Sequence, residues 1–160
     1  LEMVRMIGFD KSASMALFFV IALATSSLAE ESFRKGQAVV ETAAGQQHVL
    51  QVEYAQTPAE REQGLMGRTA LGLNEGMVFD FDRPQQVIMW MKNTPLPLDM
   101  LFINEKGVVT HVAAKTTPYS EALIPSGGLV RYVIELNGGR AEALEIHNGS
   151  RVLRGLEPDQ

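Results

Sequence analysis

Apolar and polar residues alternate along several short stretches of the chain, which is the pattern of β-strands that bury one face. Leu50, Val52 and Tyr54 share one face and alternate with more polar neighbours. Together with the apolar residues 38–40 and a turn around Gly45, they predict a β-hairpin near the start of the folded part.

The same pattern predicts further strands, turns and loops in the rest of the chain. We expect strands at residues 77–81, 86–91, 100–103, 108–114 and 129–136, a turn at Asp82-Arg83-Pro84 between the first two, a turn at residues 104–107, a loop at residues 124–128 and a short final strand after Asn148-Gly149.

Two short segments have the features of helices rather than strands. Thr57 can cap a helix, Pro58 suits its first turn, and Glu60 completes a capping box, so a helix is predicted to begin here. Gly64 weakens or ends it after a few residues. A second helix of one or two turns is predicted at about residues 139–144.

The predicted elements indicate a mainly β fold of the α+β type. Residues 87–91 and 100–103 are apolar at successive positions, so these strands are predicted to be buried on both faces. The chain has no βαβ alternation and no internal repeat. We therefore predict a small mixed β-barrel-like or sandwich domain with one or two short helices.

The first 29 residues have the pattern of a secretory signal peptide. Arg5 and Lys11 precede the apolar residues 15–24, and the small-residue exit Ser27-Leu28-Ala29 follows. Ten apolar residues are fewer than the roughly 20 that span a bilayer, which favours cleavage over anchoring. The expected product is exported to the periplasm or secreted, with a flexible leader at residues 30–37 and one compact domain at residues 38–156.

Composition narrows the classes of site and partner. The 160-residue chain contains no cysteine, which excludes disulfides, thiolate zinc sites and cysteine nucleophiles. Its net charge is −5 and it has no basic stripe, so neither nucleic acid nor an anionic membrane is an expected partner. We also expect no stable membrane span after removal of the signal peptide.

In the stretch "MWMKNTPLPLDM", residues 89–100, several polar residues lie between two apolar strands. Trp90 offers a stacking surface, and Lys92, Asn93 and Thr94 offer directional hydrogen bonds, so this segment is a candidate ligand-binding lip. Asp99 follows two prolines and could face back toward Lys92. The alternative is a buried corner in which Lys92 and Asp99 neutralise each other.

Arg61 and Arg68 lie seven residues apart in "REQGLMGR", close to two helical turns, and could share one side. Paired guanidinium groups suit carboxylates or phosphates, although both arginines could instead bond neighbouring carboxylates or carbonyls. If they join Lys92 at one mouth of the barrel, the expected ligand is a small anionic or sugar-like molecule, or an acidic segment of a protein partner.

Two other functions remain open. An enzyme, either a hydrolase or a lyase of envelope polymers, would use Asp99 as general acid or base beside Lys92. A Cu(I) or Ag(I) carrier would use thioethers; the candidates are Met66, Met77, Met89, Met91 and Met100. The three histidines show no zinc-ligand spacing, and the expectation is a binding domain with no metal, no cofactor and no assigned catalytic residue.

Three motifs in this order, "REQGLMGR", "GMVFDF" and "WMKNTPLPLDMLFINEKGVV", resemble the domain of unknown function 192 family over about residues 49–152. The matching positions are Arg61, Gly64, Leu65, Met66, Arg68, Gly76, Met77, Trp90, Met91, Lys92, Asn93, Thr94, Pro97, Leu98 and Asp99. Met89 and Leu96 depart from the family pattern. The resemblance implies a compact, mostly β domain, often behind a signal peptide, and no established reaction.

Overall fold

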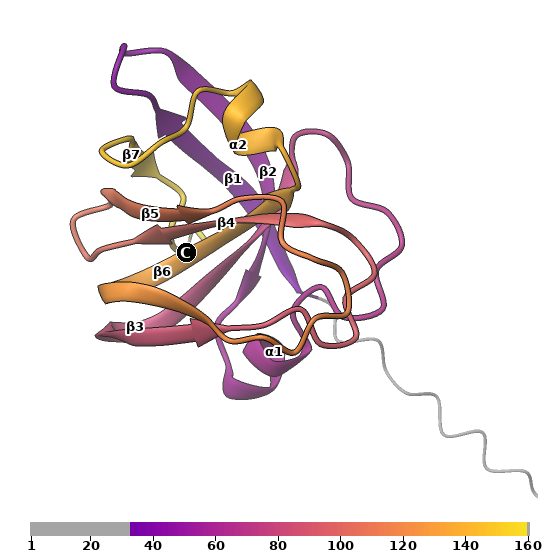
Figure 1. Ribbon diagram of the computed structural model, residues 1–160. Coiled ribbons are helices and arrows are strands. Elements are labelled where there is room, and N and C mark those ends of the chain that lie inside the picture. Colours follow the sequence, from indigo (N-terminus) through magenta and orange to yellow (C-terminus); the bar gives the residue numbers. More distant parts are fainter. Residues whose placement is uncertain (1–32, 160) are drawn as a thin grey trace, which may run out of the picture. The chain divides into compact units, whose positions relative to one another are not determined.

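The computed structural model describes residues 33–159, which form a seven-stranded sheet and two short helices (Figure 1). The strands are β1 (Arg34–Glu41), β2 (Gln47–Ala55), β3 (Glu75–Met89), β4 (Leu98–Ile103), β5 (Val109–Ala113), β6 (Ile124–Asn137) and β7 (Arg151–Arg154). The helices are α1 (Pro58–Gln63) and α2 (Arg140–Ala143). The mainly β, barrel-like fold with two short helices is therefore confirmed.

The sheet has the strand order β5-β4-β6-β3-β2-β1-β7. Strands β1 and β2 form the predicted hairpin, and β4 and β5 form a second one. The pair β2 and β3 is parallel, whereas the other strand pairs in this order are antiparallel. The chain makes the parallel crossover through α1, whose capping box at Thr57 and Glu60 forms as predicted.

The curled sheet brings its two edges together. Val108 in the turn before β5 forms an antiparallel bridge with Arg151 of β7. The amide of Val152 donates to the Gly107 carbonyl at 2.7 Å, and the Val109 amide donates to the Ser150 carbonyl at 2.9 Å. These bonds satisfy backbone groups that a free edge would leave open, so the seam stabilises the barrel-like closure.

The long strands β3 and β6 bend together and are paired on both sides of the bend (Figure 1). Between the pairs Asp80–Tyr132 and Gln85–Val130, β3 takes five residue steps where β6 takes two. The extra residues form a large bulge, in which Asp82 has a positive φ of 68°. The predicted turn at residues 82–84 is thus a bulge within one strand, and the predicted loop at 124–128 is part of β6.

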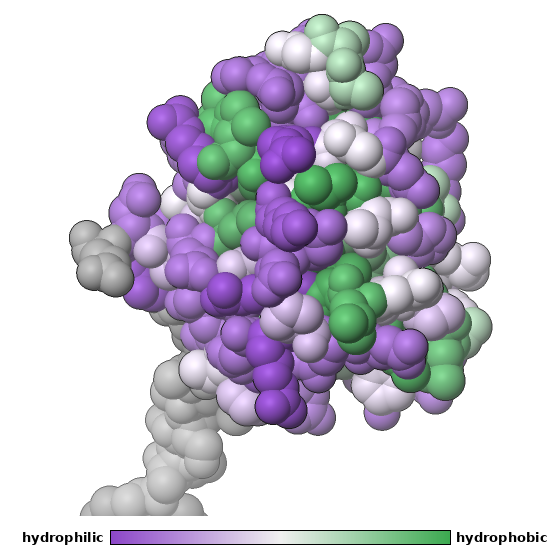
Figure 2. Space-filling view, turned by 90° about the vertical axis from the view of Figure 1, so that its left-hand side faces the viewer, coloured by the Kyte–Doolittle hydropathy of each residue, from purple (hydrophilic) through white to green (hydrophobic). Residues whose placement is uncertain are grey.

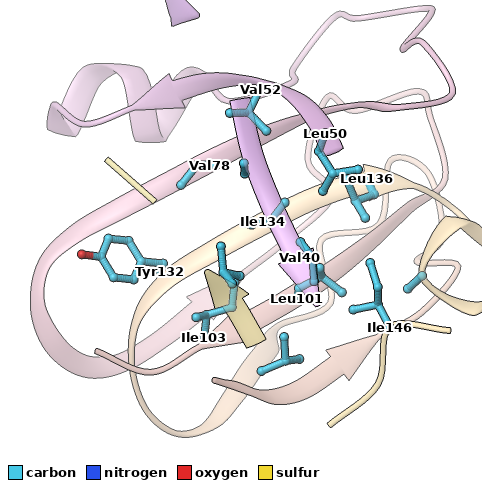
Figure 3. Packing of buried hydrophobic residues seen from close by; sticks show 14 of the residues in the cluster. Val40, Leu50, Val52, Val78, Leu101, Ile103, Tyr132, Ile134, Leu136 and Ile146 are labelled. Carbon is cyan, nitrogen blue, oxygen red and sulfur yellow. The ribbon is translucent and has the colours of Figure 1, made fainter. Parts of the chain in front are cut away.

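The sheet separates two apolar clusters. Figure 3 shows the first, inside the curl, where side chains of β1, β2, β3, β4 and β6 point toward one another and Ile146 approaches from the segment after α2. The second lies on the opposite face and includes Leu65, Met77, Met91 and Met100. Every residue of β4 is buried, as the apolar run at 100–103 predicts.

The N-terminal part of the described chain belongs to the sheet. Strand β1 begins at Arg34 and pairs with Tyr54, so residues 34–37 belong to the sheet and not to a flexible leader. The predicted signal peptide, residues 1–29, lies outside the described residues. Within residues 33–159, no helix is long and apolar enough to cross a membrane.

The surface of this unit is mixed. Figure 2, which views the left-hand side of Figure 1, shows hydrophilic side chains around several separate apolar islands. Scattered exposed apolar residues of this kind are normal for a folded domain. This face therefore offers no single continuous apolar patch for docking.

We predict that Gly107→Ala opens the seam between the β4–β5 turn and β7. Gly107 has a φ of +75°, and an added Cβ would lie 2.7 Å from the Val152 carbonyl oxygen. Gly127 is the matched control, since it has a φ of +72° and open space around its Cβ position. In urea unfolding, Gly107→Ala should lower the free energy of unfolding by at least about 1 kcal/mol more than Gly127→Ala. Equal losses would contradict the seam's role.

Candidate functional site

A hollow of about 210 Å³ lies between α1, the turn that follows it and the two arms of the bent strand β3. Its wall is mostly apolar and aromatic, with a few polar groups. The lining residues are Arg61, Glu62, Gln63, Gly64, Leu65, Met66, Phe79, Phe81, Ile88, Met89, Trp90, Thr94 and Glu135. A concave, largely apolar site with few polar groups is the usual form of a small-molecule pocket.

Glu135 of β6 is the buried carboxyl group of this hollow, with only 4 % of the residue exposed. Its direct neighbours across the sheet are Met77 of β3 and Met100 of β4, both fully buried. Within residues 33–159, no hydrogen bond or ion pair to this carboxyl group offsets its burial. Loss of water therefore raises the pKa of Glu135 to about 8, so the group is mainly protonated at neutral pH.

Arg61 fastens α1 to the bulge of β3. Its Nη1 donates to the carbonyl oxygens of Gln56 and Asp80, the latter at 2.6 Å, and lies 3.4 Å from the Asp82 carboxylate. Its guanidinium carbon also lies 5.6 Å from the centre of the Phe81 ring. These contacts hold the bend that forms the hollow, which makes Arg61 a positioning residue at the rim.

Trp90 and Thr94 also line the hollow, as the sequence led us to expect of a lip. Trp90 is 41 % exposed, and Lys92 Nζ lies 5.0 Å from the centre of its ring, within reach of a cation–π interaction. Thr94 is buried, and its hydroxyl group donates to the Lys92 carbonyl oxygen at 3.2 Å. Asn93 adopts a φ of 55°, and its carbonyl oxygen accepts from the Gly67 amide. This bond ties the lip to the turn after α1.

Arg68 lies in a different hollow from Arg61, of about 160 Å³, beside β2 and the start of β3. Its Nη2 is 2.5 Å from Glu53 Oε2, and Lys35 Nζ is 3.8 Å from the same carboxylate. The two arginines therefore do not converge on one ligand. The alternative interpretation, that they bond neighbouring carboxylates and carbonyls, describes both of them.

Asp99 is fully buried, on the face of the sheet that β4 presents to α2. Its carboxylate accepts from the amides of Lys115 at 2.7 Å, Gly139 at 2.9 Å and Ala141 at 2.8 Å. Gly139 is the N-cap of α2, so Asp99 supplies the capping oxygens that this glycine lacks. The expectation that Asp99 faces Lys92 at a ligand site is wrong, because its oxygens are held by backbone amides.

The alternative functions can also be placed on the structure. The hydrolase or lyase hypothesis requires Asp99 at the wall of an open pocket, a position that Asp99 does not occupy. The candidate metal-binding methionines do gather on one side of the sheet. Met77, Met91 and Met100 are core residues there, whereas Met66 and Met89 line the hollow. His111 stacks on Phe102, 5.5 Å between ring centres, and within residues 33–159 no three His, Cys, Asp or Glu side chains cluster as metal ligands.

Comparison with known proteins places the chain in a family. The model of the domain of unknown function 192 family, described as "Uncharacterized ACR", matches residues 39–153. The chain belongs to this family. No protein with a curated description matches the sequence.

Two solved structures are similar to this member of the domain of unknown function 192 family. One is a Sinorhizobium meliloti 1021 protein, named as a proposed transcription regulator, with 46 % identity and a TM-score of 0.76 over 77 % of this chain and 95 % of that one. The other is a Novosphingobium aromaticivorans DSM 12444 protein of unknown function, with 37 % identity and a TM-score of 0.75 over 79 % and 89 %.

Glu135 is not among the site residues predicted from the sequence. The available signal was local: Glu135 is the one charged residue in the otherwise apolar run Val133-Ile134-Glu135-Leu136. A buried charge requires a partner or loses its charge. A carboxyl group at such a position can donate a proton, accept one or pair with a cation, and these are the reactions available to a ligand in the hollow.

We predict that Glu135 makes folding stability depend on pH. Its pKa is raised from 4.5 to about 8 on folding, so the native state holds a proton that the unfolded state releases in this range. Stability is therefore highest below about pH 4.5 for this group and is lost as the pH rises through 8, by up to about 1.4 kcal/mol per pH unit. Urea unfolding at several pH values, compared with Glu135→Gln, should show this slope only in the natural protein. A pH-independent difference between the two would contradict the assignment.

We predict that Asp99→Asn lowers the free energy of unfolding by about 2–3 kcal/mol, because an amide cannot serve all three backbone donors as a carboxylate does. Asp82→Asn is the control, since that carboxylate is 73 % exposed and should change stability by less than about 1 kcal/mol. Thermal or urea unfolding measures both. Equal, small losses would mean that Asp99 does not cap α2.

Proposed function

We propose that this protein is an exported binding domain for a small molecule, and that the ligand enters the hollow beside α1 and meets Glu135. The observation that carries the proposal is a carboxyl group that is buried in the middle of a sheet, has no partner among residues 33–159, and is open to a cavity. Burying a polar group without a hydrogen bond is unfavourable by several kcal/mol at most sites. A bound ligand would supply the missing bond.

The walls of the hollow support binding rather than a purely structural cavity. Phe79 and Leu65 form an apolar wall, and Trp90 stands partly exposed at the mouth. An aromatic ring at the mouth can pack on a ligand and still face water. Arg61 and the bond from Gly67 to Asn93 fix the surrounding backbone, so the site is organised before a ligand arrives.

The single tryptophan of the chain makes occupancy measurable. Because Trp90 lines the hollow, its fluorescence should respond when a small molecule binds there. We predict that a library of small metabolites screened by Trp90 fluorescence and thermal shift contains ligands, and that Glu135→Gln and Met66→Ala weaken their binding at least about tenfold, or about 1.4 kcal/mol.

Arg68→Gln is the matched control for this screen, because Arg68 lines the other hollow. It should leave the affinity of each ligand unchanged. Ligands that respond to Arg68→Gln but not to Glu135→Gln would place binding elsewhere and overturn the proposed site. A full screen without a Trp90 response would argue against a binding function at this hollow.

The proposal of export rests on the N-terminal sequence. The charged start, the apolar residues 15–24 and the exit at Ser27-Leu28-Ala29 fit a cleaved signal peptide. Produced with its leader in a Gram-negative host, the protein should be recovered from the periplasm with Glu30 as its first residue, as measured by intact mass. Recovery in the cytoplasm with residues 1–29 still attached would contradict export.

The regulator name of the Sinorhizobium meliloti relative does not direct us to a DNA-binding function. The present chain has a net charge of −5, whereas affinity for DNA depends on clustered Lys and Arg that replace counterions. We therefore propose a ligand-binding role without nucleic acid as a partner.

A further inference from the structure

Resting on the proposed function of the hollow, we infer that its ligand is a small organic cation, with an ammonium or amine group that pairs with Glu135 and an apolar part that fills the aromatic end. The sequence led us to expect a small anionic or sugar-like ligand or an acidic segment of a partner, because Arg61, Arg68 and Lys92 were expected to converge. In the structure Arg68 lines the other hollow, and the least exposed polar residue that lines this one is Glu135, at 4 %.

The charged groups that line the hollow are Arg61, Glu62 and Glu135. Arg61 already faces the Asp82 carboxylate at 3.4 Å and donates to two carbonyl oxygens, so its charge is largely matched within the protein. Glu62 is exposed on α1. Glu135, between the fully buried Met77 and Met100, has no such match in the part of the chain that the structure describes, and a cation is the partner that a buried carboxylate requires.

The residues that line the hollow also favour a positively charged ligand. Aromatic rings attract cations over their faces. Two rings of this site already face a cation of the protein: Lys92 lies over Trp90, and Arg61 lies over Phe81. Phe79, Met66 and Met89 add a further ring and two polarisable thioethers to the lining. An alkyl or aryl ammonium ion can use the Phe79 ring and the thioethers, whereas a carboxylate would meet the negative face of a ring.

Binding of such a cation is coupled to proton release. In the free protein the Glu135 carboxyl group is mainly protonated at neutral pH. When an ammonium ion binds, the O–H bond of the carboxyl group breaks, its proton passes to water, and a carboxylate remains beside the cation. Below the pKa of the free carboxyl group, affinity should therefore rise by up to about tenfold per pH unit, whereas a neutral ligand gains nothing from the change.

Three probes of similar shape test the charge of the ligand: benzylamine, benzyl alcohol and benzoate. Trp90 fluorescence titrations at pH 6, 7 and 8 should show the tightest binding for benzylamine, with an affinity that increases about tenfold or less per unit between pH 6 and 8. In Glu135→Gln the preference for benzylamine and its pH dependence should both be lost, because the amide cannot ionise.

A variant at the rim of the hollow tests the charge of the ligand independently. Lys92→Gln removes the positive charge over Trp90, so it should strengthen benzylamine binding about twofold to fivefold and weaken any benzoate binding, as expected for like-charge repulsion near a protein surface. Arg68→Gln removes an equal charge from the other hollow and should change neither probe. An opposite effect of Lys92→Gln would overturn the inferred ligand charge.

The outcomes separate this inference from the proposed function. If benzoate or benzyl alcohol binds more tightly than benzylamine in a Glu135-dependent manner, the hollow is a binding site but the cation inference is wrong. If none of the three probes changes Trp90 fluorescence or the amide NMR signals of the hollow at millimolar concentration, both the inference and the proposed pocket are contradicted.

Discussion

The burial of one carboxyl group in the middle of the sheet is the constraint on which this account depends. Strand β6 lies between β3 and β4, so the neighbours of Glu135 on both sides are strand residues, and both are buried methionines. Within residues 33–159 no protein group pairs with this carboxyl group, and its burial disfavours the charged form. The group is therefore mainly protonated at neutral pH in the free protein, and it faces the hollow, where a ligand can reach it.

That open side is created by the bend in β3 and β6. A regular β3 strand would continue straight. The bulge at Phe81–Pro84 instead bends β3, so that its second arm lies beside α1. Arg61 fixes this arrangement by bonding the Asp80 carbonyl oxygen from the helix side. The cap at Thr57 fixes the start of α1, and the hydrogen bond from the Gly67 amide to the Asn93 carbonyl oxygen fixes the turn after α1 against the segment that follows β3. The small site is therefore built from segments that are far apart in sequence.

Local patterns predicted much of the fold. The hairpins at Gly45 and Gly107, the capping box at Thr57 and the double-sided burial of β4 all follow from short-range periodicity and turn chemistry, and all are present. The continuity of β3 was missed, because Asp82-Arg83-Pro84 has the composition of a turn. A bulge of the same composition differs from a turn only in what the neighbouring strand does, and β6 lies about fifty residues later.

The candidate site was less predictable for the same reason. Trp90, Thr94 and Arg61 do share one hollow, whereas Arg68 and Asp99 were assigned by proximity in sequence and bond elsewhere. Asp99 looks functional because it is a charged residue in an apolar strand, and its partners are backbone amides near α2 that no side-chain pattern reveals. Glu135 gave the same signal, and only the pairing of β6 with β3 and β4 shows that it faces the hollow instead.

The protonation state of Glu135 is the most direct test of this account. A ¹³C NMR titration of its side-chain carboxyl carbon, assigned by comparison with Glu135→Gln, should give a midpoint near pH 8 in the free protein. Saturating benzylamine should move that midpoint to lower pH. A midpoint near the ordinary glutamate value, unchanged by the amine, would show that the carboxyl group is solvated and would contradict both the buried site and its proposed ligand.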